Sequence, residues 1–172
     1  MSGGVLFVLV LLLVAGNAFA QPSRPSDDLL EIRLQRTACY GECPVYTLSI
    51  WKNGRVRFEG TEYVGTKGPV HGKITSAKKD LLVAEIVRAD FFSLKDAYTS
   101  RSGNCPITAT DMPSVTLRIK LNGREKTIEH YLGCFETSDK RDELPIFPRS
   151  LVLLEDKIDE IVGTDRWIRK DK

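Results

Sequence analysis

The sequence predicts an α+β fold in which two antiparallel hairpins and an N-terminal strand form a sheet, with two helices packed on one face. Two stretches alternate apolar and polar residues and run into the pairs Asn53-Gly54 and Asn122-Gly123, the strongest short-range signal of a hairpin. Two further stretches, residues 82–87 and 151–162, repeat apolar residues at helical spacing,. Such helices and sheets bury their apolar faces against each other.

The first 20 residues read as a secretory signal peptide. An apolar core from Val5 to Val14 precedes an Ala18-Phe19-Ala20 cleavage site,. We expect cleavage after Ala20 and a periplasmic or secreted protein. No Lys or Arg precedes the core, and the alternative is an uncleaved anchor, for which the apolar run is short. Residues 21–28, with two prolines and no apolar run, predict a flexible tether,.

The remaining residues, 29–172, predict a single α+β domain. Removal of the signal peptide leaves about 152 residues, enough for one core,. No other apolar run is long enough to cross a membrane. The formal net charge of +2 comes from 25 basic and 23 acidic residues. This balance argues against nucleic acid as a partner, because phosphate binding needs a concentrated positive face.

The first hairpin can be predicted to its register. Alternation indicates strands over residues 30–35 and 46–51. A three-residue loop with Gly54 in the left-handed conformation pairs Ile50 with Val56, and therefore Leu48 with Phe58. A two-residue loop would pair Ile50 with a charged residue instead. We favour the three-residue loop because it keeps one face of the hairpin apolar.

The middle of the chain contains a loop, a helix and a long connection. Gly65, Gly68, Pro69 and Gly72 predict the loop,. Ser76 is the expected N-cap of a helix that runs through about Ala89. Residues 93–113 lack periodicity and are too long for an unpinned connection in a compact domain. Cys105 lies in the middle of them, as expected of a disulfide anchor.

The second half repeats part of the first. The residues Thr47, Leu48, Ile50, Asn53, Gly54 and Arg55 recur as Thr116, Leu117, Ile119, Asn122, Gly123 and Arg124. A helix over residues 151–162 follows, with Gly163 as its C-cap. We interpret the chain as two strand-strand-helix units. The similarity between them reflects either a duplicated ββα unit or the general resemblance of one hairpin to another.

Four cysteines allow three pairings, and disulfides are the expected state in an exported chain,. We favour Cys39 with Cys43 and Cys105 with Cys134. Because a disulfide lowers the entropy of the unfolded chain, the short loop should stabilise the fold by roughly 2 kcal/mol and the long one by roughly 3.5 kcal/mol. Pro44 favours an extended conformation for Cys43, so the first pair closes a small loop at the start of a strand.

Three chemical functions compete with these structural roles. Cys39 and Cys43 form a thiol-disulfide redox pair if nearby Arg36 lowers a thiol pKa. However, three residues separate them and a strand follows, which favours a structural disulfide. Cys105, His130 and Cys134 offer three metal ligands, but export favours oxidised cysteine, and we expect no metal or cofactor. No GxSxG or HExxH motif is present, so we assign no catalytic residue.

A contact surface is the remaining site hypothesis. Tyr40, Trp51, Arg55 and Arg57 cluster in the sequence around the cysteine loop and the first hairpin. Trp51 is expected on the face opposite Leu48, and aromatic residues beside arginines are common in interfaces. Burial of Trp51 under a helix or loop is the favoured alternative.

Several segments together resemble a family of exported bacterial proteins that is known as a domain of unknown function. These segments are RTACYGECPVY, WKNGRVRFEG, GKIT, ADFFSLKDAYT, TDMPSVTLRI and GTDRWI, and the similarity extends from about Leu30 to Ile168. The CYGxCP core, Cys39 to Pro44, is its most specific part. The resemblance implies an α+β domain, mostly periplasmic or surface-located, without assigned catalytic residues. Cys105 and Cys134 lie outside the family's core pattern, which adds to the case for their pairing.

The sequence therefore favours an exported, disulfide-stapled binding or interaction domain, with a rim built from the cysteine loop and the hairpin turns. Its partner is an unknown protein or envelope ligand. The alternative is a thiol-disulfide redox protein that uses Cys39 and Cys43.

Overall fold

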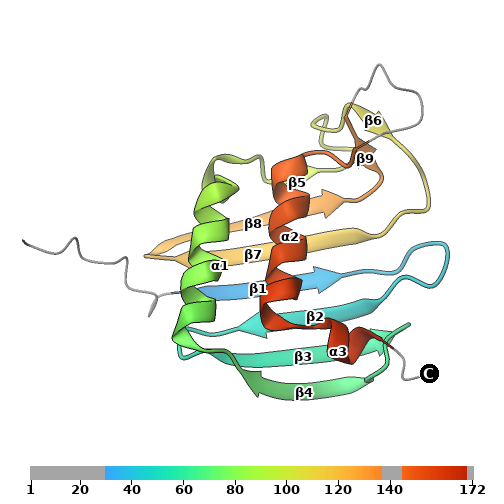
Figure 1. Cartoon of the computed structure of the whole chain (residues 1–172). Coiled ribbons are helices and arrows are strands. Elements are labelled where there is room, and N and C mark those ends of the chain that lie inside the picture. Colours follow the sequence, from blue (N-terminus) through green and yellow to red (C-terminus); the bar gives the residue numbers. More distant parts are fainter. Residues whose placement is uncertain (1–29, 137–144, 170–172) are drawn as a thin grey trace, which may run out of the picture.

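A computed structural model describes residues 30–136 and 145–169, which form a large sheet with two long helices across one of its faces (Figure 1). The elements are β1 (Glu31–Arg36), β2 (Val45–Ile50), β3 (Arg55–Glu62), β4 (Gly68–Lys73), α1 (Ser76–Arg88), β5 (Ala97–Tyr98), β6 (Ile107–Thr108), β7 (Ser114–Leu121), β8 (Arg124–Tyr131), β9 (Cys134–Phe135), α2 (Arg149–Val162) and α3 (Asp165–Ile168). The predicted signal peptide and tether, residues 1–28, lie outside the described residues. Within those residues, no helix is both long and apolar enough to cross a membrane.

The N-terminal strand lies at the centre of the sheet. The strand order is β4-β3-β2-β1-β7-β8-β5, and a separate pair joins β6 to β9. β1 pairs antiparallel with both β2 and β7, and the hairpin partners β3 and β8 lie further out. The short β5 runs parallel to β8. The predicted α+β class is confirmed, with an antiparallel sheet built from two hairpins around an N-terminal strand.

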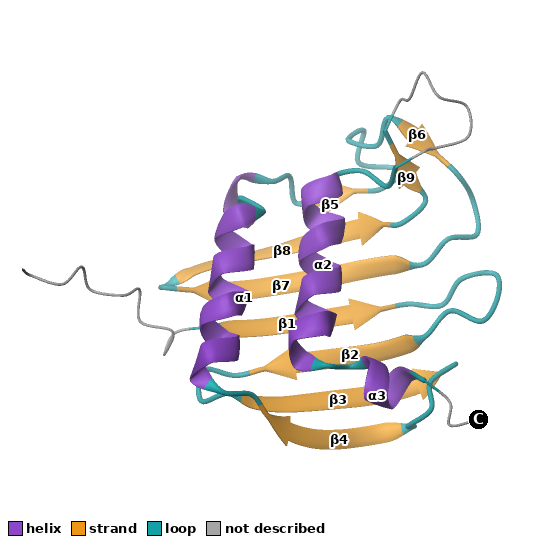
Figure 2. Ribbon diagram, viewed as in Figure 1, coloured by secondary structure: helices purple, strands orange, loops and turns teal. Residues whose placement is uncertain are grey.

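Alternation of apolar residues along the strands creates the core. Leu34 lies opposite both Leu48 and Leu117, and all three side chains are fully buried. Both long helices lie on this side of the sheet (Figure 2), and they add buried residues such as Leu82 of α1 and Leu154 of α2. Each such side chain stabilises the fold by roughly 1.5–3 kcal/mol. The predicted packing of two helices on one face is confirmed.

The first hairpin has the predicted register. Ile50 lies opposite Val56, and Leu48 lies opposite Phe58. Gly54 has a φ of 77° and donates its N–H to the carbonyl of Trp51 at 2.8 Å. The three-residue loop is therefore confirmed.

The second hairpin differs from the first in its turn and in its hand. Leu121 pairs with Arg124 across a two-residue loop, in which Asn122 and Gly123 have φ values of 52° and 79°, as in a type I′ turn. β2 and β7 run parallel to each other, yet their partners β3 and β8 lie on opposite sides of them. Because both hairpins face the same helical layer, the two units have opposite hand. This favours chance resemblance between hairpins over a duplicated ββα unit.

Two local predictions were wrong. The expected loop over residues 65–72 contains the edge strand β4, because an edge strand tolerates Pro69, which cannot donate a ladder hydrogen bond,. The N-cap of α1 is Thr75, not Ser76, since the Thr75 side chain accepts a hydrogen bond from the Lys78 N–H at 3.3 Å. The two-residue strands β5 and β6, within the long connection, are too short to show periodicity.

Candidate functional site

The sheet face that α1 and α2 do not cover, called here the open face, has two ends of different construction. At one end, called the turn end, lie both hairpin turns. At the other, called the disulfide end, lies the cysteine loop, next to the pair Arg36 and Tyr46. A six-residue strand separates them by roughly 16–20 Å. The expected single rim of cysteine loop and hairpin turns is therefore wrong.

The cysteine loop joins β1 to β2 through the disulfide between Cys39 and Cys43, whose Cα atoms are 5.7 Å apart. The side chain of Tyr40 projects into solvent and is 90% exposed. Its backbone N–H donates to the carbonyl of Asp111 at 3.0 Å. The N–H of Ser114 donates to the Thr37 hydroxyl at 2.8 Å. These bonds hold the loop against the segment that precedes β7.

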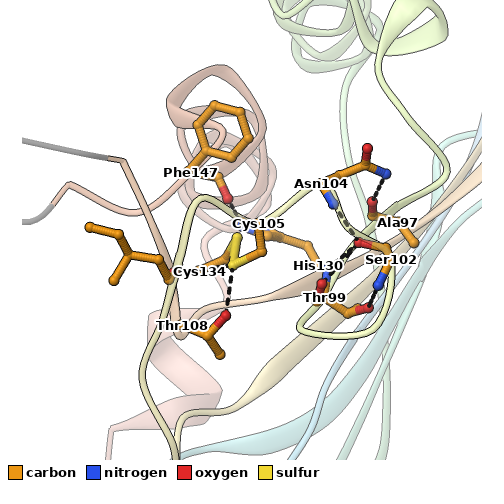
Figure 3. The surroundings of a disulfide bond; sticks show 10 residues. Ala97, Thr99, Ser102, Asn104, Cys105, Thr108, His130, Cys134 and Phe147 are labelled. Atoms are coloured by element: carbon orange, nitrogen blue, oxygen red, sulfur yellow. Dashed lines mark hydrogen bonds between the residues drawn. A yellow bond between two sulfur atoms is a disulfide. The ribbon is translucent and has the colours of Figure 1, made fainter.

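The second disulfide pins the long connection. It joins Cys105 to the fully buried Cys134 of β9, with Cα atoms 5.4 Å apart (Figure 3). The adjoining backbone is bonded as well, because the Ala109 N–H donates to the Gly133 carbonyl at 2.8 Å. A Cβ at Gly133 would lie 2.7 Å from the Ala109 oxygen and 2.5 Å from the Tyr131 ring. Only glycine allows this close approach without displacing a neighbour. Both favoured cysteine pairings are thus present in the structure.

The pinned connection walls a cavity of about 470 Å³ at the disulfide end, called here the cleft. Its walls are residues 99–101 and 108–111, and its floor includes residues of β7 and β8 such as Thr116 and Glu129. Hydrogen bonds between Ser102 and Thr99 tighten the turn beside it. The lining is rich in hydroxyl groups, and the cleft lies beside the cysteine loop through the Asp111 contact.

The turn end contains three of the four residues predicted to form a contact surface. Trp51 is 37% exposed, so the favoured alternative of a buried Trp51 is wrong. The guanidinium of Arg55 lies 5.9 Å from the centre of the Trp51 ring. Arg57 forms an ion pair with Glu59 at 3.0 Å. Tyr40, the fourth residue, lies at the disulfide end.

Two arginines that sequence analysis did not select extend this surface. The register aligns Arg57, Ser49, Arg33 and Arg118 in one row across β3, β2, β1 and β7. Arg33 and Arg118 are exposed, and Arg118 forms an ion pair with Glu125. Both arginines occupy the polar positions of strands in which apolar and polar residues alternate, so the sequence indicates that they lie on the open face. However, no local pattern shows that β1 lies between β2 and β7.

A polar cluster beneath the cysteine loop engages Arg36. Its guanidinium donates to Asp159 at 2.8 Å and to the Tyr46 hydroxyl at 2.9 Å, and that hydroxyl donates to Asp159 at 2.7 Å. Burial, and then the charge of Asp159, raise the pKa of Tyr46. Burial alone would lower the pKa of Arg36, but the surrounding Tyr46, Asp159 and Glu155 outweigh it and raise that pKa. Because Arg36 is held by Asp159, the redox hypothesis loses the cation expected to activate Cys39 or Cys43.

A second polar contact is fully buried between α2 and β8. His130 Nδ1 lies 2.9 Å from Glu155 Oε1, and His130 Nε2 lies 3.1 Å from the carbonyl oxygen of Phe147. A carbonyl only accepts, so Nε2 carries a proton. Burial raises the pKa of Glu155, which favours a neutral carboxyl that donates to Nδ1. Both His130 nitrogens are thus occupied and Cys105 is bonded to Cys134, so the hypothetical three-ligand metal site does not form.

Comparison with known proteins identifies a family. A family profile described as "Domain of unknown function (DUF6438)" matches residues 30–162. No curated protein sequence matches the chain significantly. Because the match covers most of the chain, the chain belongs to this family.

Proposed function

We propose that this family member is an exported, non-enzymatic binding module that holds an acidic partner protein on the turn end of its open face. The two disulfides fit a periplasmic or extracellular protein,. The signal peptide predicted over residues 1–20 provides the export route. The observation that carries the proposal is the row of Arg57, Arg33 and Arg118 on the open face, called here the basic row.

Charge complementarity defines the partner. Arg33 and Arg118 lie directly opposite each other on β1 and β7, and like charges in such positions repel. In the described part of the chain, the Arg33 side chain has no hydrogen bond or ion pair. A depression of about 180 Å³ lies between these arginines, Trp51 and Lys120, and the one carboxylate in its lining, that of Glu31, is outnumbered by the three cations. Carboxylates of a partner that enter it relieve the repulsion.

The composition of the surface favours a protein over an extended polymer. Trp and Arg are the residues that most often dominate binding energy at protein interfaces. Trp51 and Arg55 lie together at the turn end, and Arg57 adds a second guanidinium on the same strand. The depression is small, and the surrounding face is a sheet rather than a long groove.

Thiol-disulfide exchange is the alternative function. The cysteine loop is accessible, since Cys39 and Cys43 are both partly exposed. Arg36 is directed to Asp159 instead, and the loop leads into β2 rather than a helix. If the purified protein reduced insulin and Cys39→Ser removed that activity, the binding-module proposal would be wrong.

The binding test uses polyglutamate as a probe for an acidic protein surface. Purified oxidised protein is titrated with it at low and physiological salt, and binding is followed by Trp fluorescence. We expect the double variant Arg33→Ala/Arg118→Ala to weaken binding at least about 10-fold. Added salt should weaken binding of the unaltered protein as well, because exposed charges are screened.

The matched control removes two positive charges from the helical layer. Arg88→Ala/Arg149→Ala alters exposed residues of α1 and α2 and leaves the open face intact. Equal loss in both double variants would show a mere net-charge effect and overturn the proposal. Absence of polyglutamate binding, or tighter binding of a sulfated polysaccharide, would also overturn it.

A further inference from the structure

The cleft at the disulfide end contains two opposite charges that no residue within 30–136 or 145–169 neutralises. Arg101 and Glu129 both line it and both are exposed. Neither side chain forms an ion pair or hydrogen bond with any residue in the described ranges, and they do not pair with each other. Opposite charges in one cavity that remain apart leave room for a ligand between them.

The rest of the lining restricts the ligand's chemistry. Asp111 adds a second carboxylate, which accepts a hydrogen bond from Thr110 at 2.9 Å. Carboxylates on two sides repel a purely anionic ligand, while Arg101 repels a purely cationic one. The hydroxyls of Ser100, Thr116 and their neighbours provide donors and acceptors for polar groups,. The cleft volume of about 470 Å³ is that of a small-molecule site,.

The walls of the cleft are held in place before any ligand arrives. The disulfide at Cys105 and the close contact of Ala109 with Gly133 fix one wall. Asp111 has a φ of 67°, in the left-handed region that a non-glycine residue seldom adopts,. The carbonyl oxygen of Asp111 accepts a hydrogen bond from the Tyr40 N–H. Such local strain, held by surrounding contacts, is common at binding sites, and a preformed site lowers the entropic cost of binding.

We propose that the cleft binds a small zwitterion, an α-amino acid or dipeptide. Arg101 receives the ligand carboxylate, and Glu129 and Asp111 receive its ammonium group. Charge-assisted hydrogen bonds of this kind are the strong ones in proteins. The site is at the opposite end of the open face from the basic row, so it does not depend on the acidic-partner proposal.

The test is isothermal titration of the purified oxidised protein with alanylalanine and two blocked forms of it. One form is N-acetylated and lacks the ammonium, and the other is C-amidated and lacks the carboxylate. We expect the free dipeptide to bind at least about 10-fold more tightly than either blocked form.

Two charge-removing variants then assign each charge. Arg101→Gln should weaken binding of the free dipeptide by about 10-fold or more, and should leave binding of the C-amidated form unchanged. Glu129→Gln should weaken binding of the free dipeptide to a similar degree, and should leave binding of the N-acetylated form unchanged. Arg88→Gln, at the end of α1, is the control and should change neither affinity. The Arg33→Ala/Arg118→Ala variant should also bind the dipeptide normally.

Three outcomes would overturn the proposal. These are absence of binding by free amino acids and dipeptides up to about 1 mM, equal affinity for free and blocked dipeptides, and tighter binding of a neutral disaccharide such as maltose. The last result would identify the hydroxyl-rich cleft as a sugar site instead.

Discussion

The two ends of the open face are shaped by different means. At the turn end, loops of two and three residues close the hairpins with backbone hydrogen bonds and left-handed glycines. At the disulfide end, a connection of more than a dozen residues and the cysteine loop are each closed by a covalent bond. For the long connection the difference follows from loop length, because short turns lose little entropy on ordering whereas long loops need an added constraint.

The two ends also differ in what they present to solvent. The turn end is a basic surface on paired strands with a shallow depression, and Trp51 lies at its margin. The disulfide end is a cavity with mixed charges, walled by loops. Strands place side chains in rows at fixed spacing, while loops wall cavities. We therefore propose a macromolecular partner for the turn end and a small-molecule ligand for the cleft.

The largest expected effect is the loss of the second disulfide. Cys105→Ser/Cys134→Ser opens a loop with a sequence separation of 29, and should lower the free energy of unfolding by about 3.5 kcal/mol. Cys39→Ser/Cys43→Ser opens a separation of 4, and should cost about 2 kcal/mol. Urea unfolding under non-reducing conditions measures both. Equal losses would show that loop length does not distinguish the two staples.

A smaller effect is expected from two arginines on the same strand. Arg36→Leu leaves Asp159, whose side chain is 16% exposed, without its cationic partner, and should cost about 2–3 kcal/mol of unfolding free energy. Arg33→Leu removes a side chain on the open face and should change stability by no more than about 0.5 kcal/mol. Thermal and urea unfolding compare the pair. A large loss in Arg33→Leu would mean that the open face is structural.

The two turns at the turn end should respond differently to the same substitution. Gly123→Ala forces a left-handed alanine into open space and should cost about 1 kcal/mol,. At Gly54 the added Cβ would also lie 2.7 Å from the carbonyl oxygen of Ile74, so Gly54→Ala should cost distinctly more. Urea unfolding of both variants measures the difference. Equal costs would imply that the Ile74 backbone shifts without penalty.

A change in pH dependence is expected at the buried contact of α2 with β8. Burial raises the folded-state pKa of Glu155 above its ordinary value of 4.5, so the folded protein binds this proton more tightly than the unfolded chain. This contribution to stability is complete below about pH 4.5 and is lost as pH rises through the folded-state pKa. Glu155→Gln cannot titrate. Its stability relative to the unaltered protein should therefore increase as pH rises.

Urea unfolding from pH 4.5 to 8 tests this prediction. Parallel stability curves for the two proteins would show that Glu155 titrates normally in the folded state. Lys157→Gln, two positions further along α2 at the surface, is the matched control.

Much of the fold could be predicted because local patterns encode it. The alternation around Leu34, Leu48 and Leu117 indicates strands with one buried face. The need to keep that face apolar selects the register of the first hairpin, since a one-residue shift would expose it. β4 was not predicted because the proline and glycines within it, such as Pro69, indicate a loop. A strand can form there only because β4 lies at the edge of the sheet.

The candidate sites were predictable only in part. Trp51, Arg55 and Arg57 could be grouped because they are close in sequence and share one hairpin. Arg33 and Arg118 lie 85 positions apart in sequence, and the strand order alone makes them neighbours. Arg101 and Glu129 form the cleft together because β5 pairs with β8 beside Glu129 and the second disulfide holds the rest of the connection against β9.

The sequence by itself determined the fold class, the strand and helix periodicities and the first hairpin's register, and among three possible cysteine pairings it favoured the one that the structure contains. Each depends on residues within one element or on covalent chemistry. The tertiary structure alone decided that β1 is central, that the two hairpins have opposite hand, and that Tyr40 and Trp51 lie at opposite ends. These outcomes depend on which apolar faces pack together, and many strand orders satisfy the same local pattern of buried and exposed residues.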